Sequence, residues 1–509
     1  MVGPIKFSAL FENIASIDED LYRLRLFIDG KWVESVNKSY FELRTPLDDS
    51  LLAYVSNAGE EDAEKAVTTA KKSHRKIRDI AAIERIEIFR DAASILEERL
   101  REFSEMLIFE AGKTRHDAED EVKATIMRLR LTMEEIKKIS GEYIPGDWSE
   151  DTRGKIAVVI REPVGVVLAI SPFNYPLYIQ AAKVIPALLA GNSVIVKPSS
   201  STPISALMFA RVLQECGVPD GCLNVVTGPG NIGLKMAAHS LVNLISFTGS
   251  TQVGKEISKV ANVKHLHLEL GGKAVAIVLT DADHNLAARK CVEGAFKNAG
   301  QRCDAVSLVL VEETVADEFV KKVLEEAAKW TVGNPVKFDV KVGPLISQTQ
   351  VKRVHELVMD ALEKGGKILL GGNYEGNYYQ PTVIDHVPRN AKIMWEEIFG
   401  PILPIARVKD VAEALNIASE IRYGLDSCVF TNNFYNMWSV AKKLQVGAVT
   451  INDLPRHGVG YFPFGGVKES GIGREGIGYS IDEMTVLKTI VFNLEPISYV
   501  KKKRIEISQ

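Results

Sequence analysis

Cys303 is the residue of this sequence whose surroundings are most suited to covalent chemistry. It ends the segment Asn298-Ala-Gly-Gln-Arg302-Cys303, in which glycine, glutamine and arginine stand where a packing pattern would place apolar residues. A positive charge beside a cysteine favours the thiolate, which is the nucleophilic form. We therefore expect Cys303 to be a nucleophile, and we interpret the other four cysteines as small apolar residues.

A second candidate is the alternating series His265, His267 and Glu269. A period of two places all three side chains on one face of a strand. This spacing allows a metal site, or two hydrogen-bonded histidines beside one functional carboxylate. We favour the second interpretation and expect no bound metal, while the first leaves a metal hydrolase as an alternative.

Two glycine-rich segments could hold a phosphate. Residues 228–233 spell G-P-G-N-I-G, a dinucleotide-binding pattern, between an expected strand and an expected helix. The same spacing recurs at 471–476 without a strand, and the first copy lacks the acidic residue about 20 positions on that such sites use. Residues 249–255 approach a P-loop, but Glu256 stands where Ser or Thr would hold magnesium, which argues against an ATPase. A helix start after a strand remains an anion site.

The composition excludes several classes of protein. The 509 residues are 46% hydrophobic and 25% charged, with a net charge of −4, which is typical of a globular protein and not of a nucleic-acid binder. No apolar run is long enough to span a membrane. The five cysteines form no Cys-x-x-Cys pair, and acidic residues stand where a signal peptide would be basic. We therefore expect a cytoplasmic protein.

The elements that position these residues follow an alternating pattern. A hairpin is expected around Asp29-Gly30, and residues 60–139 are helical in pattern. Strands at 164–170, 193–196, 223–226 and 244–247 alternate with helices, which predicts a parallel sheet. Ligands bind at the carboxyl ends of such strands, where Asn174, Lys197 and Gly249 stand. A second α/β pattern begins at residue 274, and the stretch from 485 alternates like a strand.

Six motifs occur in a fixed order and are specific together. They are Ser171-Pro-Phe-Asn174-Tyr-Pro, Phe247-Thr-Gly-Ser-Thr, Glu269-Leu-Gly-Gly-Lys, Gly300-Gln-Arg-Cys303, Glu397-Ile-Phe-Gly-Pro and Pro463-Phe-Gly-Gly-Val-Lys468. In these motifs the chain resembles the aldehyde dehydrogenase superfamily, from the hairpin at 27–32 to residue 492. The resemblance implies a Rossmann-like cofactor domain (1–139 and 159–268), an α/β catalytic domain (269–484) and a small β oligomerisation domain (140–158 and 485–509). It also implies a homodimer or homotetramer.

The resemblance gives the candidate residues their roles. Cys303 attacks the aldehyde carbon, the Asn174 amide and the Cys303 N–H stabilise the oxyanion, and Glu269 activates the water that releases the acid. Glu269 favours hydrolysis over transfer to coenzyme A.

The resemblance also implies a nicotinamide cofactor, NAD or NADP. Ser200 stands where NAD-preferring relatives often carry Glu, and a hydroxyl beside Lys197 suits the 2′-phosphate of NADP, so we expect NADP to be preferred. The cofactor-binding residues that the resemblance implies are Lys197, Ser200, Gly230, Phe247, Gly249, Ser250, Glu397 and Phe399.

Four further positions point to the substrate. Tyr175, Arg302 and Arg456 resemble phosphate-holding residues of the non-phosphorylating glyceraldehyde-3-phosphate dehydrogenases, and a further family arginine falls on Lys138. Asp304 and Ser307 depart from the common family residues. We expect glyceraldehyde 3-phosphate to be oxidised to 3-phosphoglycerate without inorganic phosphate, a glycolytic step. Succinic semialdehyde, lactaldehyde and glyceraldehyde are alternative substrates, and a non-catalytic protein that keeps the fold is an alternative of another class.

Overall fold

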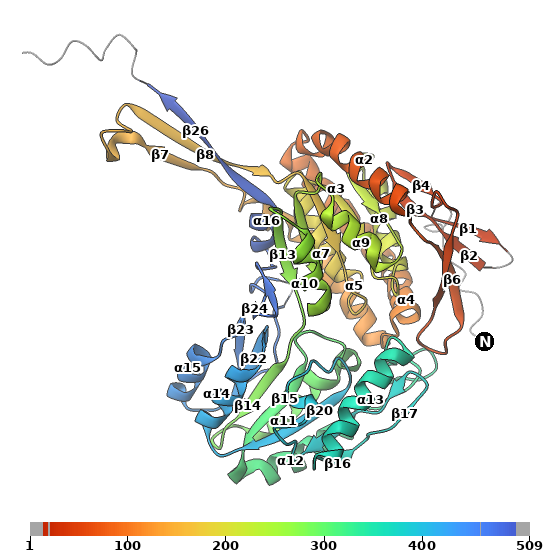
Figure 1. Ribbon diagram of the computed structural model, residues 1–509, viewed down its shortest axis with the longest axis vertical. Coiled ribbons are helices and arrows are strands. Elements are labelled where there is room, and N and C mark those ends of the chain that lie inside the picture. Colours follow the sequence, from red (N-terminus) through yellow and green to blue (C-terminus); the bar gives the residue numbers. More distant parts are fainter. Residues whose placement is uncertain (1–13, 19–20, 459, 495–509) are drawn as a thin grey trace, which may run out of the picture.

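The computed structural model describes residues 14–18, 21–458 and 460–494, and its sheets and helices confirm the expected α/β class. The outer parts of two predicted segments, residues 1–13 and 495–509, lie outside the described residues. Figure 1 shows two α/β lobes, one above the other, with a narrow arm of strands projecting from the upper lobe. Along the described chain, no helix is long and apolar enough to cross a membrane.

The first lobe is built on an eight-stranded sheet in the order β25-β13-β12-β9-β10-β11-β3-β4. Its five central strands are parallel: β9 (Val166–Ile170), β10 (Ser193–Lys197), β11 (Leu223–Val225), β12 (Leu244–Thr248) and β13 (His265–Glu269). β10 and β11 lie on one side of β9, and β12 and β13 lie on the other. Such a switch point opens a crevice at the carboxyl ends of the strands, where ligands bind.

Helices cover both faces of this sheet because alternate residues of its strands are apolar on both sides. Val167 and Ala169 of β9 pack into one core cluster, and Val166 and Leu168 pack into another. The first cluster includes α3 (Ala82–Glu98), α4 (Leu100–Ala111), α5 (Arg115–Arg130), α7 (Tyr178–Leu189) and α8 (Ile204–Glu215). The second includes α2 (Glu60–Arg78), α9 (Gly230–Ala238) and α10 (Thr251–Val260). A short helix, α6 (Thr132–Ile136), follows α5.

The N-terminal strands extend the first lobe. β3 (Leu26–Ile28) and β4 (Lys31–Val33) form the predicted hairpin, with Asp29 and Gly30 at φ of 58° and 72°. Two positive φ values match the twist of a tight hairpin. A separate sheet holds β1 (Ala15–Asp18), β2 (Leu21–Leu24), β6 (Leu51–Ser56) and β5 (Tyr40–Arg44), in that order.

The second lobe is a seven-stranded sheet in the order β16-β19-β20-β15-β14-β22-β23. Its strands are β14 (Ala274–Val278), β15 (Val306–Glu312), β16 (Lys367–Leu370), β19 (Thr382–Asp385), β20 (Ile402–Val408), β22 (Asp426–Phe430) and β23 (Ala448–Ile451). Its helices are α11 (His284–Phe296), α12 (Glu313–Ala327), α13 (Gln348–Glu363), α14 (Val411–Glu420) and α15 (Phe434–Lys443). The central strands are nearly continuous apolar runs, as expected for a sheet buried on both faces.

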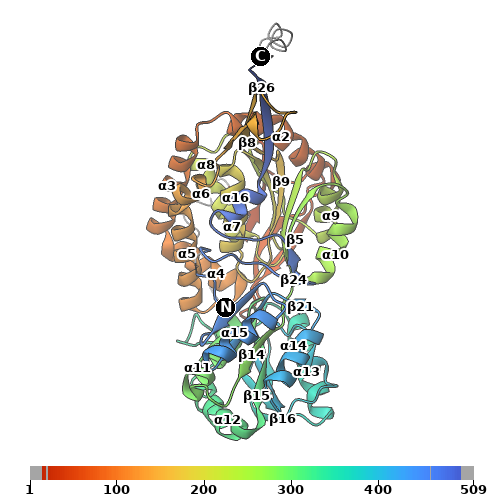
Figure 2. The same cartoon turned by 90° about the vertical axis from the view of Figure 1, so that its left-hand side faces the viewer.

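The arm is a three-stranded antiparallel sheet of β7 (Glu142–Pro145), β8 (Lys155–Pro163) and β26 (Thr485–Asn493). β8 pairs with β26 along its whole length, so this sheet continues past residue 158 to Pro163, and Gly165 then turns the chain into β9 at φ 124°. Figure 2 shows β26 and β8 standing above the first lobe, at the end opposite the second lobe.

The remaining elements are short. They are η1 (Gly146–Trp148), η2 (Lys297–Gly300), β17 (Tyr374–Glu375), β18 (Tyr378–Tyr379), η3 (Lys392–Met394), β21 (Tyr423–Gly424), β24 (Val467–Lys468), β25 (Gly471–Ile472) and α16 (Tyr479–Glu483). β25 pairs with β13, which returns the end of the chain to the first lobe.

Candidate active site

A cavity of about 320 Å³ lies between the two lobes and has Cys303 in its wall. Tyr175, Arg302 and Arg456, all expected at the substrate, also line it. Its other lining residues include Arg128 and Tyr178 of the first lobe and the loop residues His457 and Phe464.

The loop that carries Cys303 begins with a strained turn. Asn298, Ala299 and Gly300 follow α11 in the left-handed region, at φ of 53°, 54° and 68°. Two of the three carry side chains, at a cost of about 1–2 kcal/mol each. Only glycine fits at position 300, because a Cβ there would lie 2.1 Å from the Gly400 carbonyl oxygen. Backbone strain of this kind persists where the surroundings fix it.

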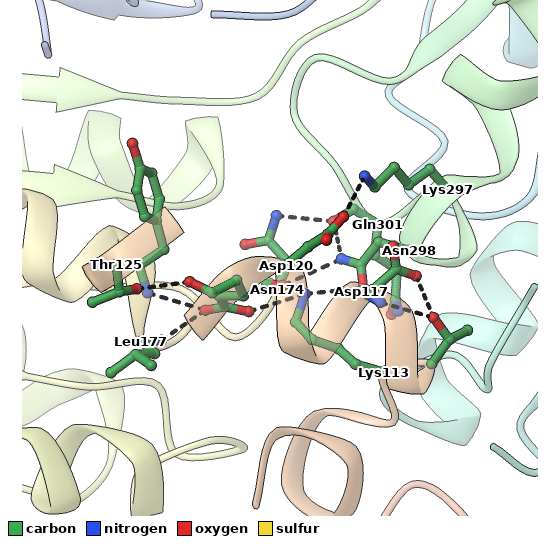
Figure 3. Close-up of polar contacts among 12 residues, drawn as sticks. Lys113, Asp117, Asp120, Thr125, Asn174, Leu177, Lys297, Asn298 and Gln301 are labelled. Carbon is green, nitrogen blue, oxygen red and sulfur yellow. Dashed lines mark hydrogen bonds and ion pairs between the residues drawn. The ribbon is translucent and has the colours of Figure 1, made fainter. Parts of the chain in front are cut away.

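The side chain of Asn298 holds this turn in place (Figure 3). Its amide Nδ2 donates to the carbonyl oxygens of Asn174 and Gln301, at 3.2 and 3.4 Å. Its Oδ1 accepts from Lys113 Nζ at 3.1 Å. Lys113 also pairs with Glu121 at 3.1 Å, and neither side chain has any exposed surface. A buried ion pair therefore anchors the turn from the first lobe.

The same ion pair fixes the segment that carries Asn174. Glu121 Oε1 accepts from the N–H groups of Leu177 and Tyr178, at 2.9 and 3.0 Å, where α7 begins. Asn174 is 5% exposed, and its Nδ2 donates to the carbonyl oxygen of Gln301 at 2.9 Å. The amide has two hydrogens, so one remains for another acceptor beside the Cys303 loop. The structure thus brings two predicted residues, Asn174 and Cys303, to one loop junction.

Glu269 ends β13 and is 2% exposed. Neither carboxylate oxygen makes a hydrogen bond within the described residues. Burial, and then the charge of Glu475, raise the pKa of Glu269 well above its usual value, although Lys183 and Arg474 oppose the shift. A carboxyl group with a raised pKa and free oxygens is suited to accepting a proton.

The histidine series does not converge on one metal site. His265 is exposed, whereas His267 is buried with its Nε2 3.3 Å from Glu269 Oε1. Within the described ranges, no group of three metal-ligating side chains comes together. The arrangement matches the interpretation of a hydrogen-bonded histidine beside one carboxylate.

Cys303 does not have the environment that its sequence neighbour suggests. Burial, and then the carboxylate of Asp304, raise the pKa of Cys303 well above its usual value; Asp426, Glu269 and Glu397 act in the same direction. Arg302 cannot counter this fully, because its guanidinium is held by Asp304 through Nε at 3.1 Å and Nη2 at 2.8 Å. The expected stabilisation of a resting thiolate is therefore wrong, and a base must take the thiol proton.

Each arginine, lysine and histidine that lines the cavity has a carboxylate partner. The pairs are Arg128–Glu135 at 2.5 Å, Lys297–Asp120 at 3.4 Å, Arg302–Asp304 at 2.8 Å, Arg456–Glu293 at 3.3 Å and His457–Asp426 at 3.0 Å. Two guanidiniums nevertheless keep unused donors. Arg302 Nη1 and Arg128 Nε and Nη1 are buried and make no hydrogen bond in the described part of the chain. Unpaired buried donors are costly, so these two arginines hold hydrogen-bonding capacity that the free protein does not use.

Lys138 is not brought to this cavity. It is exposed in the turn after α6, where its aliphatic chain lies against Gly478. Arg128, which sequence reasoning missed, lines the wall instead. It shares the buried face of α5 with Glu121 and Thr125, at helical spacing. A charged residue on an otherwise buried helix face was the signal available in the sequence.

The expected cofactor residues gather at the carboxyl edge of the first sheet. Lys197 ends β10, is 4% exposed, and burial lowers its pKa to about 8. Ser200 Oγ donates to the Gly228 carbonyl oxygen at 2.8 Å. Gly230 opens α9 with free space where a Cβ would stand, and Ser250 is the N-cap of α10. Two helix N-termini at one edge offer unpaired N–H groups to a diphosphate.

The second lobe contributes to the same edge. Glu397 Oε1 accepts from the Gly272 N–H at 3.0 Å. Gly271 lies between Glu397 and Thr251 of α10, because a Cβ on it would be 3.0 Å from the first and 3.1 Å from the second. Phe399 meets Phe173 edge to face at 5.7 Å. Phe247 packs beside Gly249, where a Cβ would collide with its ring. These residues fit a dinucleotide that spans both lobes.

Comparisons with known proteins agree with this geometry. Residues 32–490 match the model of the aldehyde dehydrogenase family. The chain is 39% identical to the NADP-dependent glyceraldehyde-3-phosphate dehydrogenase of Streptococcus equinus over 470 residues, 92% of this chain and 98% of that one. It is 37% identical to the 3-sulfolactaldehyde dehydrogenase of Priestia aryabhattai and to the lactaldehyde dehydrogenase of Methanococcus aeolicus, over 92% of this chain and 98% and 100% of theirs. The NADP complex of the NADP-dependent glyceraldehyde-3-phosphate dehydrogenase of Bacillus halodurans superposes with a TM-score of 0.91 at 38% identity, over 92% of this chain and 99% of that one.

Proposed function

The chain belongs to the aldehyde dehydrogenase family, and from this premise we propose that it oxidises glyceraldehyde 3-phosphate to 3-phosphoglycerate without inorganic phosphate. The enzyme uses NADP or NAD, and we propose NADP as the preferred acceptor. Lactaldehyde, succinic semialdehyde and glyceraldehyde are the competing substrates.

One observation carries the choice of substrate: two buried guanidiniums with unused donors line the cavity that holds Cys303. Each charge-assisted hydrogen bond is worth roughly 1.5–3 kcal/mol. Two such bonds, formed when the bound substrate turns Arg128 and Arg302 toward the cavity, would favour a phosphorylated aldehyde over a neutral one by roughly 10²–10⁴. A neutral substrate such as lactaldehyde leaves the same donors unpaired.

The residues divide the reaction into two halves. A base takes the proton of Cys303, and the thiolate adds to the aldehyde carbon, which places negative charge on the carbonyl oxygen. The second Asn174 amide hydrogen and the Cys303 N–H stabilise that oxygen. The nicotinamide, when bound, supplies the acceptor for the hydride that leaves the carbon. Glu269 then takes a proton from water, the water oxygen adds to the thioester carbon, and the carbon–sulfur bond breaks to release the acid.

The proposed preference for NADP depends on Ser200 and Lys197. A Glu at position 200 would repel a 2′-phosphate, whereas a serine hydroxyl can rotate away from Gly228 and donate to it. Lys197 is the cation at the same strand end. Comparing kcat/KM for the two cofactors tests this preference, and a tenfold advantage of NAD would overturn it.

We also propose a homodimer or homotetramer in the cytoplasm. The arm exposes Tyr143, Leu487, Val491 and Phe492, an apolar set suited to contact with another copy. All five cysteines are unpaired, as is usual in a reducing compartment.

The decisive experiment mixes purified protein with NADP and D-glyceraldehyde 3-phosphate in a buffer free of inorganic phosphate. Strong formation of reduced cofactor, with the acid as product, is the expected result. No turnover with this substrate, but turnover of lactaldehyde or succinic semialdehyde, would discard the phosphate assignment and keep the Cys303 chemistry.

A further inference from the structure

A buried chain of polar groups leads from α7 across β12 to the end of β13. Lys183 Nζ lies 3.2 Å from Ser246 Oγ, Ser246 Oγ lies 2.9 Å from His267 Nδ1, and His267 Nε2 lies 3.3 Å from Glu269 Oε1. The four side chains are between 0% and 2% exposed. Water therefore has little access to these contacts.

The first contact fixes the direction of the second. Lys183 carries only donors, so the Ser246 oxygen accepts from it. The serine then has its own hydrogen to give, and His267 Nδ1 is the acceptor in reach. A neutral imidazole that accepts at Nδ1 carries its proton at Nε2. Burial, and then Lys183, lower the pKa of His267 well below its usual value, so the ring is neutral.

The Nε2 proton is consequently on the nitrogen nearest the Glu269 carboxylate, 3.3 Å from Oε1, although this contact does not have the geometry of a hydrogen bond in this structure. Along the described chain, neither His267 Nε2 nor either Glu269 oxygen has a hydrogen-bond partner. Catalytic contacts are often long in the free enzyme and shorten when substrate binds. The segments that flank β24 and β25 confine both side chains, because a Cβ on Gly465 would lie 2.8 Å from Glu269 Oε1 and one on Gly473 would lie 2.9 Å from the His267 ring.

We propose that His267 is a positioning residue for the deacylation half of the reaction, and that its Nε2 proton holds the Glu269 carboxylate ionised and aimed as the base. The proposal rests on the role of Glu269 given above, and it holds for any aldehyde. Lys183, through Ser246, sets which nitrogen of the ring carries the proton.

The other charged groups around the pair do not replace this donor. Glu475 and Asp426 raise the pKa of Glu269, while Lys183 and Arg474 lower it. Lys183 is itself shared with Glu475 Oε2 at 3.3 Å. Arg474 Nη1 donates to the carbonyl oxygens of Gly466 and Gly473. Glu483 lies near Gly473 and accepts from the Arg474 N–H.

Two matched substitutions of His267 distinguish the roles of its two ring nitrogens. The amide nitrogen of glutamine reaches the position of Nε2, so His267→Gln keeps a donor for Glu269. Asparagine reaches only the position of Nδ1, so His267→Asn keeps the contact with Ser246 and loses that donor. Both variants remove the ring, so a loss of packing affects them alike.

The assay uses p-nitrophenyl acetate, which acylates Cys303 without cofactor or natural substrate. The thiolate displaces p-nitrophenolate in a burst, and water then releases acetate from the thioester. We expect His267→Asn to keep the burst rate within about twofold and to slow the steady rate by about tenfold or more, the loss of one hydrogen bond to a charged group. The acidic limb of the steady rate should move up by about one pH unit. His267→Gln should stay within about threefold of the parent enzyme.

Three outcomes would overturn the proposal: equal steady rates in the two variants, an unshifted acidic limb in His267→Asn, or equal losses of burst and steady rate. Glu269→Gln serves as the control, because an unchanged steady rate there would refute the base itself rather than His267. If His267→Asn fails to fold, Ser246→Ala takes its place, since it frees the ring to carry its proton on either nitrogen. It should slow the steady rate in the same direction, and an unchanged rate would equally refute the proposal.

Discussion

Replacing Lys113 by methionine tests how the anchor behind the Cys303 loop works. The substitution leaves Glu121 as a buried carboxylate without its cation, and breaking a buried pair in this way costs about 3–5 kcal/mol. It also removes the donor to Asn298 Oδ1 and the ammonium that sits 3.8 Å from the centre of the Tyr175 ring. Stability and activity should therefore both fall, for different reasons.

A second substitution separates the two effects. Lys113→Met combined with Glu121→Gln removes both charges, and replacing both partners of a buried pair is often close to neutral. Gln keeps an oxygen for the N–H groups of Leu177 and Tyr178. For a lobe of this size, the single variant should lower Tm by roughly 6–20 °C, and the double variant should recover most of that loss.

Activity should not recover with stability. Asn298 has lost its lysine in both variants, so its hold on Asn174 and Gln301 loosens, and a displacement near 1 Å costs about 10² in kcat/KM. Thermal unfolding and steady-state oxidation at 25 °C provide the two readouts, with Asn298→Ala as the matched control. A double variant as active as the parent would refute this reasoning and reduce Lys113 to a counter-charge for Glu121.

Four further predictions concern the cavity. Arg302→Ala should raise KM for glyceraldehyde 3-phosphate far more than for glyceraldehyde, and equal effects would contradict the phosphate role. Arg128→Met should do the same, whereas Lys138→Ala, outside the cavity, should leave both KM values unchanged. Asp304→Asn should lower the pKa of Cys303, because Asp304 is the largest charge that raises it; iodoacetamide alkylation across pH measures this, and an unmoved midpoint would count against it. Cys303 must lose the proton that its raised pKa retains, so kcat/KM should fall as the pH drops below that value, and a flat acidic profile would be inconsistent with this.

Most of the scaffold could be predicted from sequence because it depends on local patterns. Alternating strands and helices between 164 and 260 predict the parallel sheet, and Asp29-Gly30 predicts the hairpin, since positive φ at both positions is a property of these residue types. Asn174, Glu269 and Cys303 stand at strand ends or loop starts, where such a sheet places its ligands. Their convergence follows from topology.

The charge partners could not be read in the same way. Asp304 is two residues from Arg302, yet whether it faces Arg302 or solvent depends on the turn at Asn298, which Lys113 of the first lobe holds in place. The resemblance placed a family arginine at position 138, but Lys138 does not line the cavity. The buried face of α5 brings Arg128 there instead. Contacts between distant parts of the chain therefore determine the partner of Arg302 and the cation at the cavity wall.

The pairing of β13 with β25 and of β8 with β26 has a consequence for how the chain is made. The first lobe holds its own sheet edge at residue 269, but the strand that covers this edge is synthesised about 200 residues later, at Gly471–Ile472. A ribosome-bound chain that has finished its second lobe therefore still presents a bare strand edge beside Glu269, the proposed base, and bare edges invite pairing with other chains. Contacts that join such distant residues are slow to form. The residues from Gly471 onward thus complete this edge of the first lobe, and the strand that carries Glu269, the proposed base, reaches its final paired form only after they have been synthesised.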